Sequence, residues 1–177
     1  TYIQQTRFNP WQALFPASPS TFLFDSYSRT QIQKEMIHFQ QAWEQKSFKI
    51  ALDCLTKILG LGIGLTPTGD DFITGLLASF SALKQLPSNF QQLAVLAKER
   101  TNAVSYAEIH EAVNERFSQL VQRVFLSIES GNTNEMAQAV SALEEVGSTS
   151  GSDILCGIIF GLKLFCEENN HDNSHSN

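Results

Sequence analysis

Apolar side chains recur at helical spacing along nearly the whole chain after residue 28. Ile32, Met36, Phe39 and Trp43 are separated by four, three and four residues, which places them on one face of a helix. Alternation of apolar and polar residues, typical of strands, is scarce, and no hairpin turn separates two runs rich in β-branched residues. The pattern predicts a mostly α-helical bundle, with helices over 28–46, 48–59, 70–86, 90–99, 105–129, 135–146 and 153–167.

The two ends of the chain depart from this pattern. Three of the five prolines lie in the first 20 residues, so residues 1–27 are predicted to be an extended arm with packed aromatic side chains, or the remnant of a missing N-terminal domain. Residues 28–168 are predicted to form the helical domain. Residues 169–177 contain no apolar side chain and are predicted to be disordered.

Charge and hydropathy exclude two classes of partner. Twelve basic against 18 acidic side chains give a net charge of −6, whereas a nucleic-acid binder needs a basic surface. No apolar run approaches the roughly 20 residues that cross a bilayer. We therefore expect a cytoplasmic protein that binds neither nucleic acid nor membrane.

The cysteines and histidines show no metal-site spacing. Cys54, Cys156 and Cys166 are odd in number and form no C-x-x-C pair, which predicts buried free thiols in a reducing compartment. Cys156 lies near a glycine-rich turn and is the candidate for a reactive thiol. His110 lies in a helical pattern, which favours a structural or interface role over that of a base.

Nine of the ten glycines lie in two segments, 60–75 and 147–161. The segments align at a constant offset of 82 residues, with Thr68-Gly69-x-Asp71 over Ser150-Gly151-x-Asp153 and with Gly75 over Gly157. We interpret this as a possible internal pseudo-repeat with twofold-related helices; the alternative is coincidence between two helix starts. Each segment also matches the capping box, in which the hydroxyl caps the helix and the aspartate reaches back to the cap amide.

The first turn has more glycine than a helix start needs. Gly60, Gly62 and Gly64 cost backbone entropy unless close approach or special dihedral angles require them. Free amides at a helix N-terminus bind phosphate or carboxylate. Since the capping box uses only Asp71, Asp70 is predicted to be free to hold a cation, orient an amide or act as a base. The pattern favours an anion-binding or catalytic loop, with tight packing of two capped helices as the alternative.

The segment 62–75 reads Gly-Ile-Gly-Leu-Thr-Pro-Thr-Gly-Asp-Asp-Phe-x-x-Gly and resembles the G-x-G-L-T-P-S/T-G-D-D-x-L-x-G signature of the AllH family. Thr-Asn-Ala-Val-Ser at 101–105 and Gly-Ser-Thr-Ser-Gly-Ser-Asp at 147–153 follow in the order that the family shows. The resemblance covers roughly residues 50–165. It implies a subunit of oxamate carbamoyltransferase in ureide and purine catabolism, which converts oxalurate and phosphate into oxamate and carbamoyl phosphate together with other subunits; many family members are uncharacterised.

The predicted site joins the two turns. Loop amides with the Thr66 and Thr68 hydroxyls would cradle phosphate, the second helix start would hold the substrate carboxylate, and aspartates would orient the carbamoyl group. The predicted catalytic residues are Asp70, Asp71 and Asp153. The predicted binding residues are Gly62, Gly64, Thr66, Thr68, Gly69, Asn102, Ser105, Ser150, Gly151 and Ser152.

Neither turn contains Lys or Arg, although the implied ligands are anions. A positive charge is therefore expected from Arg100, from a metal ion such as Mg²⁺, or from a partner subunit. Two other functions remain open: a non-catalytic helical scaffold whose turns pack against other subunits, and a metal-dependent hydrolase that uses the three aspartates.

Overall fold

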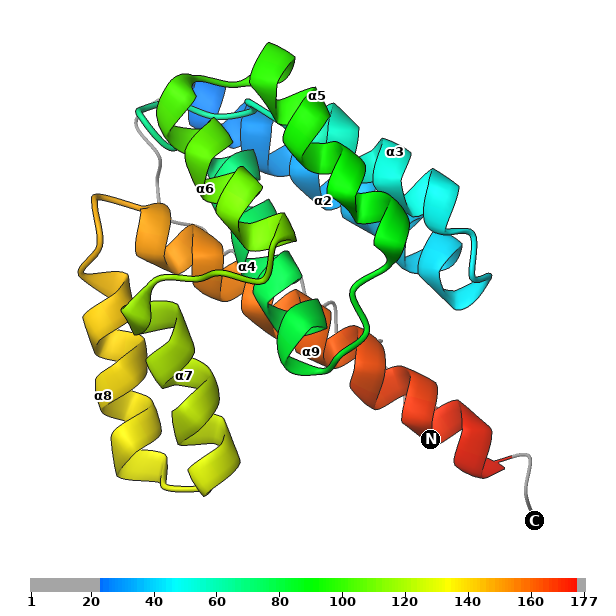
Figure 1. Cartoon of the computed structure of the whole chain (residues 1–177), viewed down its shortest axis with the longest axis vertical. Coiled ribbons are helices and arrows are strands. Elements are labelled where there is room, and N and C mark those ends of the chain that lie inside the picture. The colour runs from blue at the N-terminus through cyan, green and yellow to red at the C-terminus, as the bar shows by residue number, and fades with distance from the viewer. Residues whose placement is uncertain (1–22, 175–177) are drawn as a thin grey trace, which may run out of the picture.

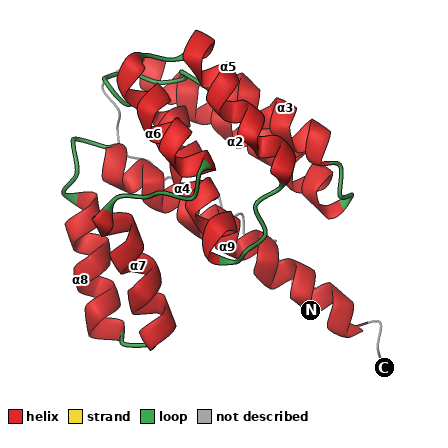
Figure 2. Cartoon of the chain, viewed as in Figure 1, coloured by secondary structure: helices red, strands yellow, loops and turns green. Residues whose placement is uncertain are grey.

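The computed structural model describes residues 23–174, with side chains from 27 to 166. Within this range all regular elements are helices and no strand occurs, which confirms the predicted mostly α-helical fold (Figure 2). The elements are α2 (Leu23–Glu44), α3 (Phe48–Ile58), α4 (Thr68–Ala82), the 3-10 helix η1 (Ser88–Gln91), α5 (Gln92–Arg100), α6 (Ala103–Val113), α7 (Gln119–Ser130), α8 (Thr133–Glu144) and α9 (Ser150–Ser174). None of the helices in this range is long and apolar enough to cross a bilayer.

Helices α4 and α9 cross at the centre of the bundle, between two groups of helices (Figure 1). On one side, α2, α3, α5 and α6 enclose a core rich in aromatic rings, in which Trp43 stacks on Phe80 with ring centroids 4.5 Å apart. On the other side, the hairpin of α7 and α8 packs a smaller core that includes Val121, Val124 and Leu143. Every α4 residue from Thr68 to Phe80 is buried because α4 contributes to both cores.

Glycine lets the backbones of α4 and α9 touch. A Cβ at Gly75 would overlap the carbonyl oxygen of Ile154, and a Cβ at Gly157 would overlap the carbonyl oxygen of Phe72. Phe72 and Ile154 are separated by the same 82 residues as the two glycines. The two overlaps are therefore reciprocal, as expected if a twofold operation relates the two helices, and they support the predicted pseudo-repeat.

Although α4 and α9 cross, their chains run in the same direction. Near their N-termini Thr66 Oγ1 and Ser150 Oγ are 2.7 Å apart, and farther along Ser79 Oγ donates to the Ile158 carbonyl over 2.9 Å. A Cβ at Gly161 would meet the Ser79 side chain, again at an offset of 82 residues. The two helices consequently start at the same end of the crossing.

Several predicted boundaries were wrong. The single helix over 105–129 is two helices, because the chain turns after Val113, Glu115 adopts a φ of 59°, and Ser118 caps α7 by accepting a hydrogen bond from the Val121 amide. The apolar stripe continues across this break because α6 and α7 both face buried cores. Helix α4 ends at Ala82 and not at residue 86.

The ends also differ from expectation. Helix α2 begins at Leu23, inside the segment predicted to be an arm, and residues 1–22 lie outside the described range. Helix α9 continues to Ser174, into the segment predicted to be disordered. Cys54 and Cys156 are buried as predicted, whereas Cys166 is exposed.

Candidate functional site

The start of α4 is not capped as the capping box predicts. Pro67 occupies the N-cap position, and Thr68 is the first helical residue, with a buried side chain. The Pro67 carbonyl accepts from the amides of Asp70 and Asp71 at 2.9 and 3.1 Å. Proline fits this place because its ring fixes φ near the value of −58° found here. The carboxyl group of Asp71 therefore has no capping role.

The start of α9 differs from its predicted cap in a similar way. Ser150 is the first helical residue, and the Asp153 amide donates to the carbonyl of Thr149 over 2.9 Å. The hydroxyl of Ser150 points to the other turn, where Thr66 shares its hydrogen bond of 2.7 Å. The two glycine turns thus meet through these hydroxyls, as the sequence predicts for a shared site.

Asp70 is a structural anchor, contrary to the prediction that it is the free carboxylate. Its side chain is 1% exposed and accepts from the Gly60 amide over 2.7 Å and from the Thr101 hydroxyl. Burial raises its pKa, whereas hydrogen bonds from Gly60, Thr101 and Ser105 lower it. Asp70 therefore ties the loop after α3 to the start of α6.

Asp71 is the carboxyl group that the site leaves without such partners. It is 1% exposed, and neither carboxyl oxygen accepts a hydrogen bond from the described residues. Burial raises its pKa to about 7, although the nearby Ser150 and Thr66 hydroxyls lower it in part. The charges of Glu108 and Asp153 raise it further. Asp71 can consequently hold or release a proton near neutral pH.

Asp153 faces a basic group that the sequence analysis missed. Arg29 of α2 lies 3.7 Å from the Asp153 carboxylate, and its side chain is 28% exposed. No pattern pointed to Arg29, because 124 residues separate it from Asp153 and it precedes both turns. Arg100, the predicted source of positive charge, instead donates to the Thr56 carbonyl over 3.2 Å.

The loop predicted to cradle an anion uses part of its backbone for packing and hydrogen bonds within the loop itself. Gly62 has a φ of 138°, and a Cβ there would overlap the Thr68 amide, so only glycine fits. The Gly69 amide donates to the Leu61 carbonyl over 2.8 Å and is not available to an anion. Gly64 is exposed, with open space around it.

Four other predicted binding residues serve local structure. The Asn102 side chain caps α6, accepting from the amides of Val104 and Ser105 at 2.9 and 3.2 Å. The buried Ser105 hydroxyl lies at Asp70 and contacts the Leu65 carbonyl at 3.4 Å. Gly151 packs against the carbonyl of Leu143 at the end of α8. Ser152 is exposed and lines a different cavity, between α7, α8 and α9.

Two side chains near the aspartates change other expectations. Glu108 of α6 was not predicted, yet burial and the charge of Asp70 raise its pKa, and its own charge reaches Asp71. Cys156 is unsuited to nucleophilic chemistry, since burial and the charge of Asp153 raise its pKa to about 12 against the opposing effect of Arg29.

The described side chains include no group of three His, Cys, Asp or Glu residues that could hold a metal ion. The three aspartates therefore do not gather into the cluster that the metal-dependent hydrolase alternative requires. What the arrangement offers is a buried acid at the meeting point of two helix starts, with two hydroxyls and one guanidinium nearby.

Comparison with known proteins supports the resemblance in sequence. No solved structure matches this chain. The family model described as oxamate carbamoyltransferase subunit AllH matches residues 58–162, a range that includes both helix starts, their aspartates and the segment between them. Because the match covers more than half of the 177 residues, the chain belongs to the AllH family.

Proposed function

We propose that this chain is a subunit of oxamate carbamoyltransferase and that it contributes Asp71, Thr66 and Ser150 to the substrate site. The family description supports the enzyme. The observation that supports the site is the meeting of the two glycine turns around a buried carboxyl group with no hydrogen-bond partner in the described chain and a pKa of about 7.

Asp71 suits the proton transfer that the reaction requires. A phosphate oxygen attacks the carbamoyl carbon of oxalurate, and the bond from that carbon to the oxamate nitrogen breaks with its electron pair on nitrogen. That nitrogen then needs a proton to leave as oxamate. The protonated carboxyl of Asp71 donates it, and the proton lost by phosphate restores the acid. An acid whose pKa lies near 7 is matched to this role at neutral pH.

The groups around Asp71 suit anionic ligands. The hydroxyls of Thr66 and Ser150 hydrogen-bond to each other and lie beside Asp71, and either can turn to donate to a phosphate or carboxylate oxygen. Arg29 brings one positive charge beside Asp153. These contacts would position the reacting groups and stabilise charge as it develops.

Reconstitution of the chain with the other carbamoyltransferase subunits tests the proposal through oxalurate-dependent formation of carbamoyl phosphate. Asp71→Asn is expected to lower kcat about 100-fold or more with a small change in KM, because it removes the acid. Asp53→Asn is the matched control, since Asp53 is an exposed carboxylate on α3. For the unsubstituted complex kcat should fall as the pH rises above 7. Unchanged turnover by Asp71→Asn would reject the acid role.

The scaffold function has one observation in its favour. Ile63 and Leu65 in the first turn are 55% and 76% exposed, as expected for a loop that packs against another subunit. If the chain is a scaffold, Leu65→Asp should prevent assembly while Asp71→Asn leaves turnover intact. The two variants together separate the two functions.

A further inference from the structure

A cavity of about 520 Å³ lies near the aspartates, since its lining residue Glu108 interacts with Asp70 and Asp71. Helices α6 and α7 form one side of it, and α4, α8 and α9 form the other. Its size is that of a small-molecule site. Most of its wall is apolar, formed by Phe117, Leu120, Val121, Leu143, Val146 and Ile154.

Thr74 of α4 places an unused polar group in this apolar wall. The residue is 9% exposed, and its hydroxyl oxygen is buried with no hydrogen-bond partner among the described residues. A threonine within a helix commonly donates to a carbonyl of the preceding turn, which this one does not do. A buried hydroxyl without a partner is costly, and a bound ligand would remove that cost.

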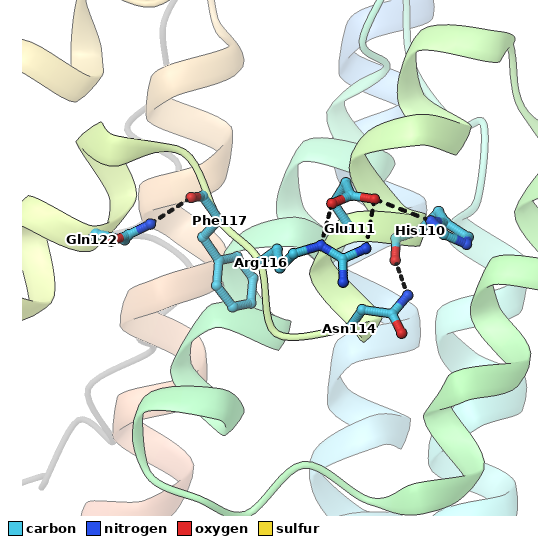
Figure 3. A network of polar contacts seen from close by, with 6 residues as sticks. All are labelled: His110, Glu111, Asn114, Arg116, Phe117 and Gln122. Carbon is cyan, nitrogen blue, oxygen red and sulfur yellow. Dashed lines mark hydrogen bonds and ion pairs between the residues drawn. The ribbon is translucent and has the colours of Figure 1, made fainter.

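The charged groups at the cavity leave one carboxylate unbalanced. Arg116 contacts both carboxyl oxygens of Glu111, one of them over 2.8 Å, so these two charges neutralise each other (Figure 3). Glu108 also lines the cavity, and no basic side chain pairs with it in the described part of the chain. Asp70 and Asp71 lie near enough for their charges to interact with Glu108. The potential in the cavity is therefore negative.

The link between α6 and α7, which lines the cavity at Arg116, Phe117 and Ser118, is held in place by hydrogen bonds. The Gln122 side chain donates to the Phe117 carbonyl over 2.8 Å, and the Asn114 side chain donates to the His110 carbonyl over 2.7 Å (Figure 3). Together with the Arg116–Glu111 pair, these bonds fix the link between α6 and α7 that forms one wall. A ligand would enter a preformed site and would not have to order the loop first.

We propose that this cavity binds an organic cation: an ammonium or guanidinium group on an apolar body. The cationic group lies at Glu108, and the apolar body lies among the aliphatic and aromatic walls. A carboxylate of the same shape is repelled by Glu108. The cavity is not lined by Asp71, Thr66 or Ser150, so the proposal does not depend on the proposed enzyme function.

Three probes of equal length test the proposal by isothermal titration calorimetry of the full chain at pH 8. They are 3-phenylpropylamine, 3-phenylpropanol and 3-phenylpropanoate, which share the apolar body and differ in charge. The amine is expected to bind most tightly and the carboxylate most weakly. Glu108→Gln should weaken amine binding about threefold to fivefold, the value of a partly exposed ion pair, and should abolish the preference for amine over alcohol. Glu99→Gln on α5 is the matched control, because Glu99 is exposed and does not line the cavity.

A second variant tests the position of the site. Ala107 is exposed on α6 and lines the cavity, so Ala107→Trp should fold and obstruct it. This variant is expected to lose amine binding, whereas Ala103→Trp, at an exposed position of the same helix away from the cavity, should retain it. The proposal is overturned if no probe binds, if the carboxylate binds as tightly as the amine, or if Ala107→Trp binds the amine normally.

Discussion

The first glycine turn, 60–75, and the second, 147–161, place equivalent glycines at the crossing of α4 and α9 but different groups at the helix starts. At the position where the first turn has Asp70, bonded to Gly60 and Thr101, the second has the exposed Ser152. Asp71 and Asp153 are equivalent aspartates, yet within the described part of the chain only Asp153 pairs with an arginine. Sequence identity is required where backbones touch, and elsewhere the two halves have been free to specialise.

The largest loss of stability should come from substitutions at the symmetric crossing of α4 and α9. Gly75→Ala and Gly157→Ala each drive a Cβ into a carbonyl oxygen, of Ile154 or Phe72, and are expected to lower the free energy of unfolding by about 4 kcal/mol or more, at the upper end of overpacking. Urea unfolding measures the loss. Gly131→Ala, at a φ of 67° with no atom nearby, should lose only about 1 kcal/mol. Markedly unequal losses at the two crossing positions would break the symmetry argument.

Neutralising the two equivalent aspartates should change the stability at pH 8 in opposite directions. The folded state raises the pKa of Asp71 from 3.8 to about 7, so its contribution to stability is full at low pH and is lost as the pH rises through 7. At roughly 1.4 kcal/mol per unit, the loss between pH 5 and pH 8 is on the order of 3 kcal/mol. Asp71→Asn should recover it at pH 8, whereas Asp153→Asn should lower stability because it removes the ion pair with Arg29. Urea unfolding at pH 5 and pH 8 measures these changes in the free energy of unfolding. The predicted difference between the two aspartates is contradicted if both variants change it in the same direction.

Alanine substitutions at the equivalent positions 70 and 152 should differ by a smaller amount in the free energy of unfolding. Asp70→Ala leaves the partly buried Gly60 amide and Thr101 hydroxyl without this acceptor and is expected to cost about 2 kcal/mol of unfolding free energy. Ser152→Ala, at an exposed position, should change it by less than about 0.5 kcal/mol. Thermal unfolding of both variants measures these two losses. Equal losses would mean that Asp70 does not anchor the loop.

The smallest effect concerns thiols and leaves stability unchanged. Cys156, equivalent to Thr74 in the first turn, is buried with a pKa of about 12, while Cys166 on the same helix is exposed. A disulfide reagent should therefore modify one thiol in the native protein, and Cys166→Ser should abolish that reaction. Rapid modification of Cys156 before unfolding would show that the α4–α9 crossing opens.

The sequence was a good guide to what local pattern controls. Helical periodicity predicted the helical class and most helix centres, and the 82-residue offset predicted the twofold relation, because each depends on residues within one or two turns. The break between α6 and α7 was missed because the apolar stripe passes through Phe117 without interruption. Nothing in the stripe shows that Glu115 adopts a positive φ.

The site was predicted less completely, because its chemistry depends on contacts between distant segments. Both turns were expected to share a site, and Thr66 and Ser150 do meet. The roles of Asp70 and Asp71 were exchanged, since Pro67 took the capping position that the pattern assigns to Thr68. Arg29 and Glu108 come from α2 and α6, and only folding reveals that they lie beside the aspartates.

The parallel course of α4 and α9 has an electrostatic consequence. A helix carries about half a positive elementary charge at its N-terminus, and neighbouring antiparallel helices largely cancel one another. Here the macrodipoles of two long helices add, so about one positive charge is fixed at the meeting point of Thr66 and Ser150. The backbone itself therefore supplies cationic character in two turns that contain neither lysine nor arginine, and, unlike a titratable side chain, it keeps this character at any pH, while salt screens it.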